Sequence, residues 1–503
     1  MSTSIVKRRQ LGLLPARSGP RIEARSDGPT QAEADALGAM ILLQDPQGPL
    51  PAKGPFAATW RALHARSAPT HGETRVAALA DGRCTLVLAY CRAEASAFER
   101  LTVAGNACKA LRGVRTDAPR RLGVVAGVRE RAATWLDALC AAACAQYFEL
   151  PTTRAATAPL ERVTAFGARN FDAKRAQAAA DATNLVRHLT ALPPNVLDGA
   201  GYRRAIATLA RRHGLRFRWL GAAALRKAGA GAFLAVAQGG AMRDAGIAHL
   251  SWQPRAARAR PDVALVGKGI VFDTGGTNLK PHRGMLDMHT DMAGSAVALA
   301  LLLAAAQLRV PQRVDAWLAI TDNAIGPKAY RPQDVLTAAN GTTIQVIHTD
   351  AEGRLVLADT LALAGATRPA MMIDFATLTG ACVTALTERM SGVFANRDDL
   401  RERLVAAGVA SGERVWPFPL DPDFDSDLES RVADVAQCAV DGKGDHILAA
   451  RFLQRFVPDD VAWAHVDLSA ATRKGGLAHV ATEETGFGVR FGLSLLLDAK
   501  ASA

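Results

Sequence analysis

The stretch Val263–Gly276, with the sequence VALVGKGIVFDTGG, decides the fold class. Its first four residues, Val263–Val266, form a short apolar run that predicts a strand buried on both faces, as in a parallel sheet. The glycine-rich continuation is otherwise apolar but carries two charges, Lys268 and Asp273. A buried charge is costly unless it is paired. We therefore treat these two residues as candidates for a functional site.

Helical and strand patterns alternate on the C-terminal side of this stretch. The predicted helices are about Met285–Gln307 and Leu355–Ala364, and the predicted strands are Val314–Ile320, Thr343–Ile347, Met371–Phe375 and Trp463–Leu468. Alternation of this kind predicts an α/β fold with a mostly parallel sheet flanked by helices. In such sheets, ligands bind at the carboxyl ends of the strands.

The first third of the chain predicts a second, smaller α/β domain. Its strands are expected at Arg75–Ala80, Thr85–Tyr90 and Leu122–Val128, with a helix over Ala132–Tyr147. A polar-rich helical pattern then covers Asp172–Leu189 and stops at Pro193-Pro194-Asn195. We predict an N-terminal α/β domain at 1–168, a linking helix at 169–195 and a larger catalytic domain at 196–503. The first ~25 residues are expected to be a flexible tail.

Composition and charge exclude several classes of protein. The chain has 503 residues, 49% hydrophobic and 21% charged, which is typical of globular proteins and not of disordered ones. The net charge of +12 is spread in short basic groups without a nucleic-acid-binding motif, so DNA binding is not expected. The longest apolar run, Ala296–Leu308, is too short to span a bilayer. We expect a soluble, cytoplasmic protein with no membrane partner.

The cysteine content indicates a reducing compartment. Seven cysteines are an odd number and are spread thinly over the chain, unlike those of a secreted disulfide scaffold. Cys140 and Cys144 are one helical turn apart in an alanine-rich stretch. We expect two buried thiols there and no metal site.

A second charged segment, Thr349–Arg354, has the sequence TDAEGR and directly follows the strand predicted to end at Ile347. In an extended chain, the spacing of Asp350, Glu352 and Arg354 directs all three side chains to one side. A helix is predicted to begin immediately afterwards, and acids in a first turn are stabilised by the helix dipole. This segment alone therefore leaves helix capping and a functional site open.

Four carboxylates could converge at the strand ends. These are Asp273, Asp291, Asp350 and Glu352. Crowded carboxylates repel and raise one another's pKa values, whereas two divalent cations would neutralise their charge of about −4. Two metal ions lower the pKa of a bound water and polarise a carbonyl, which suits amide hydrolysis. Spacing does not show that the two segments meet in space.

The stretch His348–Leu355, HTDAEGRL, closely resembles the signature of the leucine aminopeptidase family, also called cytosol aminopeptidases. Supporting matches are Pro193-Pro194-Asn195, Ala329-Tyr330-Arg331-Pro332, Ala376-Thr377-Leu378-Thr379-Gly380 and Gly486-Phe487-Gly488-Val489-Arg490. The resemblance covers about Leu185 to the C-terminus. It implies a metal-dependent aminopeptidase that releases residues, leucine-like ones preferred, from peptides with a free N-terminus. It also implies a homohexamer.

The resemblance implies a role for each matched residue. Two divalent ions, Mn²⁺ or Zn²⁺, would be held by Lys268, Asp273, Asp291, Asp350 and Glu352. Lys268 would be a neutral amine ligand. Lys280 would polarise the scissile carbonyl, and Arg354 would hold a bicarbonate ion that carries the proton of the attacking water. The pocket for the first side chain would be lined by Met288, Thr377 and Gly380.

The sequence departs from the family pattern at three places. His348 stands where asparagine is usual, Asp322 replaces a glutamate, and Asp445–Leu448 replaces a stretch of small residues near the pocket. These changes bear on the preference for the substrate side chain. For His446, a surface position, a narrowed pocket and a contact with an acidic side chain all stay open. The triplet Asp273-Thr274-Gly275 also occurs in aspartic proteases, but that mechanism needs a second such triplet, which the sequence lacks.

Overall fold

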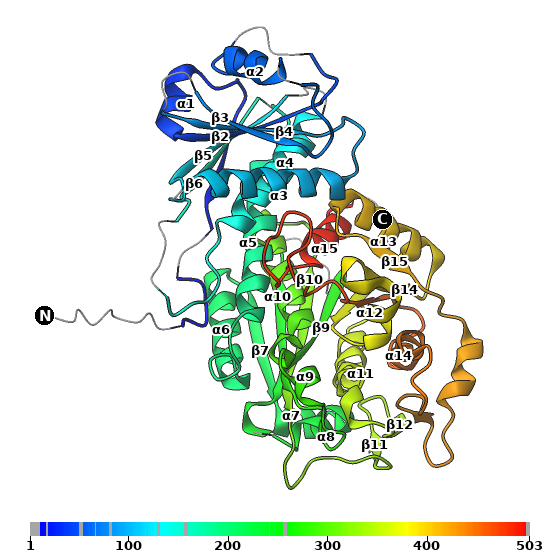
Figure 1. Cartoon of the computed structure of the whole chain (residues 1–503). Helices are drawn as coiled ribbons and strands as arrows, with labels where there is room; N and C mark the ends of the chain where they lie inside the picture. The colour runs from blue at the N-terminus through cyan, green and yellow to red at the C-terminus, as the bar shows by residue number, and fades with distance from the viewer. Residues whose placement is uncertain are drawn as a thin grey trace, which may run out of the picture. The chain divides into compact units, whose positions relative to one another are not determined.

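The computed structural model describes most of the chain, which forms two compact units (Figure 1). The described residues are 11–16, 19–49, 54–65, 67–79, 83–115, 117–127, 131–154, 159–167, 169–240, 242–254 and 259–498. The first unit comprises Met1–Asn184, Val409–Gly412 and Arg473–Thr485. The second comprises Leu185–Gly408, Glu413–Thr472 and Gly486–Ala503. The division between the units falls within helix α5 (Ala173–Thr190), where the sequence predicts a linking helix.

The first unit is built on a six-stranded sheet of order β1-β6-β5-β2-β4-β3. All neighbouring strands are parallel except the pair β3 and β4. The strands are β1 (Arg21–Arg25), β2 (Ala39–Gln44), β3 (Thr74–Ala78), β4 (Thr85–Tyr90), β5 (Arg121–Ala126) and β6 (Arg162–Phe166). The helices are α1 (Gln31–Leu37), α2 (Ala57–His64), α3 (Ala97–Val114) and α4 (Ala132–Gln146). The α/β class predicted for this part of the chain is confirmed.

The predicted tail of about 25 residues is wrong in its last part. Strand β1 (Arg21–Arg25) pairs in parallel with β6 at the edge of the sheet. Only Ile22 of its five residues is buried, so the sequence gives no apolar pattern there. Residues 1–10, 17 and 18 lie outside the described residues, as do the ends of the predicted strands at Ala80 and Val128. Cys140 and Cys144 are buried free thiols on α4, as predicted.

The second unit is built on an eight-stranded sheet of order β15-β14-β17-β13-β9-β10-β8-β7. Its strands are β7 (Arg216–Gly221), β8 (Gly246–Trp252), β9 (Val263–Asp273), β10 (Val314–Asn323), β13 (Met371–Ala376), β14 (Ser391–Ala395), β15 (Val415–Pro417) and β17 (Ala462–Asp467). The four central strands, β17, β13, β9 and β10, are mutually parallel. Toward the edges of the sheet, three pairs of neighbouring strands are antiparallel, namely β8 with β10, β7 with β8 and β14 with β17. The predicted mostly parallel sheet is confirmed.

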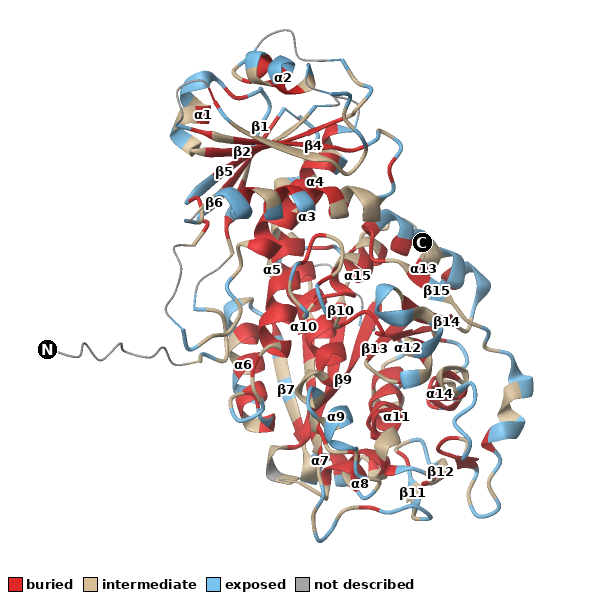
Figure 2. Ribbon diagram, viewed as in Figure 1, coloured by how far each residue is buried: buried red, intermediate tan, exposed pale blue. Residues whose placement is uncertain are grey.

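Helices cover both faces of this sheet. They are α6 (Gly199–Arg212), α7 (Ala222–Lys227), α8 (Gly231–Ala237), α9 (His282–Met285), α10 (Ala293–Leu308), α11 (Glu352–Gly365), α12 (Gly380–Leu386), α13 (Asp398–Ser411), α14 (Asp445–Gln454) and α15 (Val489–Leu496). The short 3₁₀ helices are η1 (Met242–Asp244), η2 (Met288–Thr290), η3 (Thr349–Ala351), η4 (Thr387–Arg389) and η5 (Pro422–Leu428). Strand β9 and helices α10 and α11 are buried along almost their whole length (Figure 2).

Two element predictions in this unit need correction. The single helix predicted over about Met285–Gln307 is divided into α9, η2 and α10, because the polar turn between them carries Asp291 to a site at the sheet edge. The strand predicted over Thr343–Ile347 is β12 (Thr343–Gln345). It belongs to a separate three-stranded sheet with β11 (Val335–Thr337) and β16 (Val435–Ala436).

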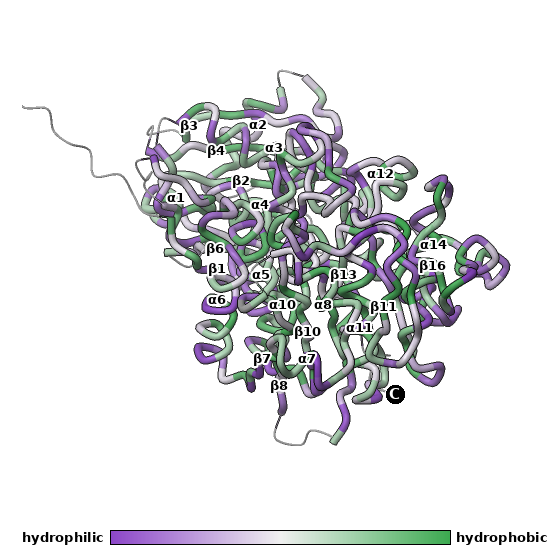
Figure 3. Tube along the Cα trace, turned by 90° about the horizontal axis from the view of Figure 1, so that it is seen from below, coloured by the Kyte–Doolittle hydropathy of each residue, from purple (hydrophilic) through white to green (hydrophobic). Residues whose placement is uncertain are grey.

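The segment 282–308 is long and apolar enough to cross a membrane by length and composition alone. However, 83% of its most apolar stretch is buried within the structure. Helix α10 packs against β9, β10 and β13 and is buried from Ala293 to Ala306. Figure 3 colours the chain by the hydropathy of its residues. The hydrophobicity of α10 is therefore accounted for by burial in the protein core.

Candidate metal centre

The carboxyl ends of three neighbouring parallel strands bring polar side chains together. Asp273 is the last residue of β9, Asn323 is the last residue of β10, and Thr377 directly follows β13. In the register of the sheet, Asn323 lies opposite Asp273. The sequence predicts a site at this edge because parallel strands all end there.

The five predicted metal ligands lie together at this edge. Lys268 comes from β9, Asp291 from the turn before α10, Asp350 from η3, and Glu352 from the first position of α11. Carboxylate oxygens of Asp273, Asp350 and Glu352 lie within 4.8 Å of one another. The two charged segments that the sequence left separate therefore meet in space.

Two lysines pair with these carboxylates. The Nζ of Lys268 lies 2.8 Å from an oxygen of Asp291 and 2.9 Å from an oxygen of Glu352. It also donates to the Thr377 carbonyl oxygen at 2.9 Å. The Nζ of Lys280 lies 3.0 Å from Asp273 and 2.6 Å from Asp350. The cluster thus holds four acidic and two basic groups, and the Lys280 side chain is the more exposed of the two lysines.

Burial and crowding disturb the charges of this cluster. Burial, followed by the charge of Asp273, raises the pKa of Glu352 to about 8. Burial also raises the pKa of Asp291 to about 6 and that of Asp350 above its ordinary value. Burial by itself lowers the pKa of Lys268, but the Asp291 and Glu352 carboxylates outweigh it and the net pKa is raised. A neutral Lys268 therefore requires a cation that displaces its proton.

The donor set fits divalent cations. Carboxylate oxygens are the ligands that Mn²⁺ and Mg²⁺ prefer, and Zn²⁺ also accepts them together with nitrogen. Four carboxylates and two ammonium groups leave an excess of negative charge when all are ionised. Burial, the largest cause of the raised pKa values of Asp291 and Glu352, makes that charge costly. Ions bound between these oxygens would supply the missing positive charge.

Two glycines allow the helices to approach the sheet closely enough to form this cluster. A Cβ atom on Gly294, in the first turn of α10, would lie 2.0 Å from the Phe375 carbonyl oxygen. A Cβ atom on Gly353, in the first turn of α11, would lie 2.6 Å from the Lys268 Cε atom. A larger residue at 294 would push α10 away from β13, and one at 353 would displace the Lys268 side chain from the cluster. The glycine in the TDAEGR segment thus has a packing role.

Asn323 holds two of the candidate ligands, a role that the sequence analysis missed. Its Nδ2 donates to Asp273 at 2.8 Å, to Glu352 at 3.2 Å and to the Thr349 carbonyl oxygen at 3.1 Å. The Thr377 hydroxyl similarly donates to Asp291 at 2.7 Å. In the sequence, Asn323 could have been noticed as a polar residue that follows an apolar strand. A polar side chain that is buried there needs partners.

Gln437 fixes the segment before α11 and was also missed. Its side-chain oxygen accepts from the backbone N–H groups of Ile347 and His348, and its Nε2 donates to the Ala351 carbonyl oxygen. His348, at the start of η3, accepts from the Asp350 N–H through Nδ1 at 3.2 Å. No pattern around Gln437 sets it apart in the sequence, because its partners lie almost ninety residues away.

Arg354 lies beyond the carboxylate cluster on α11 and is fully buried. Its Nη1 donates to the Gln437 carbonyl oxygen at 3.1 Å, and its Nη2 donates to both carboxylate oxygens of Asp445 at 2.8 Å. Burial lowers the pKa of the guanidinium, but neighbouring acidic groups, Asp445 first among them, raise it by more. The ion pair with Asp445 was not predicted.

With this geometry in place, comparison with known proteins identifies the family. Residues 184–492 match the family model described as the catalytic domain of the cytosol aminopeptidase family. The chain belongs to this family. The resemblance carried by the HTDAEGRL signature is thus confirmed.

Relatives of the cytosol aminopeptidase family align over much of this chain. Probable cytosol aminopeptidases from Methylorubrum extorquens and Syntrophotalea carbinolica are 42% and 43% identical over 327 and 324 residues. The alignments span 64% of this chain and 64% of the length of these relatives. Among solved structures, the bottromycin maturation enzyme BotP in complex with Mn has a TM-score of 0.81 and 30% identity. That likeness covers 93% of this chain and 100% of BotP.

Of the three residues that the family resemblance assigns to the substrate pocket, Thr377 contacts the cluster directly. Thr377 contacts both Lys268 and Asp291, and Met288 lies in η2 just before Asp291. Gly380 begins α12, is exposed, and faces open space where a Cβ atom would be. The assignment of these three residues to a pocket stays a prediction.

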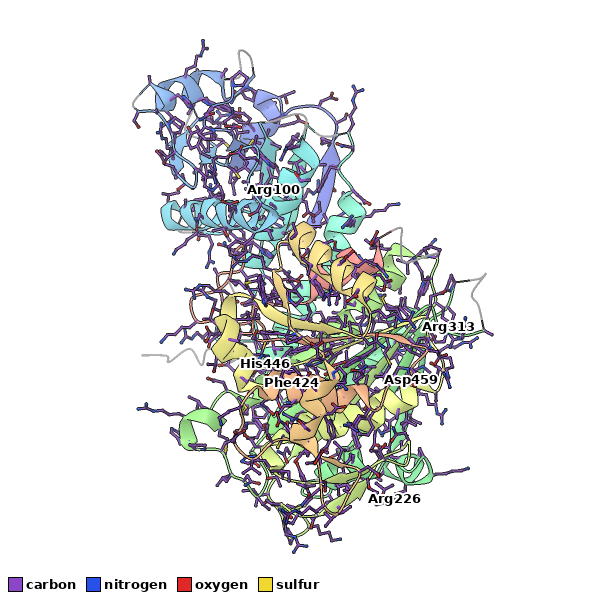
Figure 4. The ribbon with its side chains drawn as sticks, turned by 90° about the vertical axis from the view of Figure 1, so that its right-hand side faces the viewer. Arg100, Arg226, Arg313, Phe424, His446 and Asp459 are labelled. Carbon is purple, nitrogen blue, oxygen red and sulfur yellow. The ribbon has the colours of Figure 1, made fainter. Side chains whose placement is uncertain are left out.

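Two residues that depart from the family pattern, His446 and Asp322, lie in different surroundings. His446, labelled in Figure 4, is half-buried on α14, with its ring 4.4 Å from that of Phe418 and 6.3 Å from that of Phe394. Burial lowers the pKa of His446, which favours its neutral form. Asp322 is half-buried, and burial followed by the charges of Asp198 and Asp244 raises its pKa to about 6. A fully exposed position for His446 is thereby excluded.

Proposed function

We propose that this chain is a metal-dependent aminopeptidase that releases the N-terminal residue from peptides. The convergence of Asp273, Asp291, Asp350 and Glu352 with Lys268 carries the proposal, because it gathers the metal-ligand set within the family's catalytic domain. The names of the curated relatives support the same activity. A leucine-like preference rests on the family resemblance.

Two divalent ions per chain, Mn²⁺ or Zn²⁺, are the proposed cofactors. Lys268, Asp273, Asp291, Asp350 and Glu352 would hold them. Such ions lower the pKa of a bound water and polarise a carbonyl oxygen. The manganese named for BotP, a relative at 30% identity, supports the choice of a divalent metal.

The chain's own residues would orient the substrate and stabilise developing charge. Lys280 reaches the carboxylate cluster from a less buried position than Lys268, and it would donate to the carbonyl oxygen as negative charge develops there. The acidic cluster would attract the substrate's free amino group. Because one Cα atom separates that amine from the first carbonyl carbon, cleavage would occur one residue from the end.

Other features of the proposal rest on the family alone. A homohexamer is implied by the resemblance, and the mass in solution from light scattering tests it. A cytoplasmic location agrees with the names of the curated relatives. DNA binding is not part of the proposed function, because the basic residues form no recognised motif.

Blocking the amino group of the substrate tests the exopeptidase assignment. A leucyl peptide is expected to release free leucine, and its N-acetylated twin is expected to be hydrolysed at least about a hundredfold more slowly. Acetylation removes the amine lone pair and adds bulk at the acidic cluster, so binding and orientation are lost together. Mass spectrometry of the products gives the cleavage position. Comparable internal cleavage of both peptides would show an endopeptidase and contradict the proposal.

A further inference from the structure

The chain itself supplies a carboxylate to the arginine that the resemblance assigns to a bicarbonate ion. Both oxygens of Asp445 accept from the Arg354 Nη2 at 2.8 Å. The arginine side chain is 2% exposed and the aspartate side chain 25% exposed. The buried guanidinium thus has an anionic partner that remains in partial contact with solvent.

The start of helix α14 (Asp445–Gln454) holds the Asp445 carboxylate in place. Asp445 is the first residue of this helix, where the helix dipole stabilises a negative charge. Gly444 precedes it with a φ of +61°, a left-handed conformation that glycine adopts without steric cost. This turn begins α14 at the position that brings the Asp445 side chain to Arg354. Small residues are usual in this stretch of the family, so Asp445 is a departure from the family pattern.

One of the other donors of Arg354 is engaged: Nη1 donates to the Gln437 carbonyl oxygen at 3.1 Å. Nε has no hydrogen-bond partner among the described residues, and one of the two Nη1 hydrogens also remains. Both bidentate forks of the guanidinium include Nη2, which Asp445 occupies. A second anion would therefore lack a complete fork and would meet the negative charge of the aspartate at close range. The site as built does not fit a bicarbonate ion held by the guanidinium fork.

We propose that the Asp445 carboxylate is the resident anion of Arg354, which makes this chain independent of bicarbonate. The catalytic meaning of this inference rests on the proposed aminopeptidase function, whereas the binding argument does not. Carboxylate and bicarbonate present the same pair of oxygens to a guanidinium, so one can replace the other.

The carboxylate also has the chemistry needed for proton transfer. In hydrolysis of a peptide bond, the attacking water loses a proton as its oxygen bonds to the carbonyl carbon. The leaving amine gains a proton as the C–N bond breaks. Asp445 would accept the first proton and return it to the amine, ending the cycle ionised with no other base consumed. Arg354 would hold this carboxylate in position.

Calorimetry with sodium bicarbonate and peptidase rates in carbonate-free buffer test the proposal on the metal-loaded enzyme. The wild-type protein should give no binding heat, and its rate should change by less than about twofold when bicarbonate is added. Asp445→Gly leaves the Arg354 guanidinium without its carboxylate partner. This variant should bind bicarbonate. Its rate should be roughly a hundredfold lower than that of the wild type in the absence of bicarbonate, and added bicarbonate should restore part of the rate.

Two further variants separate charge, space and helix stability. Asp445→Asn fills the same space without charge, so its rate should fall and bicarbonate should not restore it. Asp398→Gly removes the corresponding first residue of α13, which is 83% exposed, and should change neither the rate nor the bicarbonate response. Circular dichroism checks that each variant is folded. If Asp445→Gly does not fold, the rate of Asp445→Asn and the bicarbonate titration of the wild type still test whether Asp445 is the anion of Arg354.

Bicarbonate binding to the wild-type protein, or a severalfold rise of its rate, would overturn the proposal. So would an Asp445→Gly variant that keeps the wild-type rate and does not bind bicarbonate. A wild-type protein without any peptidase activity would instead refute the proposed function. In that event the calorimetric comparison of wild type and Asp445→Gly would still test the partner of Arg354.

Discussion

Replacing Glu352 with glutamine is expected to remove bound metal and to lower peptide hydrolysis by roughly a thousandfold or more, because metal ions contribute several kcal/mol to such reactions. Glu352 is buried between Lys268 and Asn323 and would be a metal ligand. Glutamine keeps the shape of the side chain but removes the charge that two cations require. Elemental analysis gives the metal content per chain, and leucine release gives the rate.

Glu413→Gln is the matched control for this variant. Glu413 is another buried glutamate of the second unit, and burial raises its pKa to about 7. One of its oxygens accepts from the N–H groups of Gly488 and Phe491, at 2.9 and 2.8 Å, and a glutamine oxygen can accept both. This variant should keep metal and activity. If Glu352→Gln also retained metal and rate, Glu352 would not be a ligand.

Lys280→Ala is expected to keep its metal but to lose about a hundredfold or more in kcat, the effect of removing one donor to a developing oxyanion. Lys280 is not in the proposed ligand set, although its ammonium lies 3.0 Å from Asp273 and 2.6 Å from Asp350. The loss should fall mainly on kcat, because the interaction strengthens as charge develops on the oxygen. Steady-state kinetics and metal analysis on the same sample separate the two effects.

An exposed lysine of the same unit serves as the control. Lys227 lies at the end of α7, and Lys227→Ala removes the same charge without touching the cluster. Its kcat and metal content should equal those of the wild type. A Lys280→Ala variant that turns over normally would refute the role of Lys280. Loss of metal together with rate would make Lys280 a structural part of the metal site.

The sheet of the second unit could be predicted from sequence because its central strands are mostly apolar on both faces. Val263–Val266 has no polar residue and Met371–Phe375 has only Asp374, and a helical pattern follows each. Strand β9 continues seven residues beyond the predicted run, through Lys268 to Asp273. The glycines and charges of these seven residues do not form the apolar pattern of a buried strand. They can be buried because the acidic cluster pairs with Lys268 and offsets the cost of burying its charge.

Edge strands and broken helices could not be predicted with the same signals. β1 buries one residue of five, and β7 is mostly polar or half-exposed, so neither shows a regular apolar pattern. The break before α10 depends on Asp291, whose partners Lys268 and Thr377 are remote in the sequence. Periodicity reports only local preference, whereas this turn is stabilised by tertiary contacts.

The residues of the candidate site also fall into two groups, those found from sequence motifs and those that depend on contacts between remote segments. The resemblance supplied Lys268, Asp273, Asp291, Asp350 and Glu352, and the structure brings them together. Asn323, Gln437 and the partnership of Arg354 with Asp445 depend on which strands and helices become neighbours. Burying these polar groups is favourable only with partners, and those partners are defined by the fold.

Titrating metal into metal-free protein tests the central claim most directly. The wild-type protein, stripped by chelation and verified by elemental analysis, is supplied with increasing Mn²⁺ or Zn²⁺ while leucine release from a free leucyl peptide is followed. The account predicts no release without metal and full activity once two ions are bound per chain. Full activity in the verified metal-free protein would contradict it.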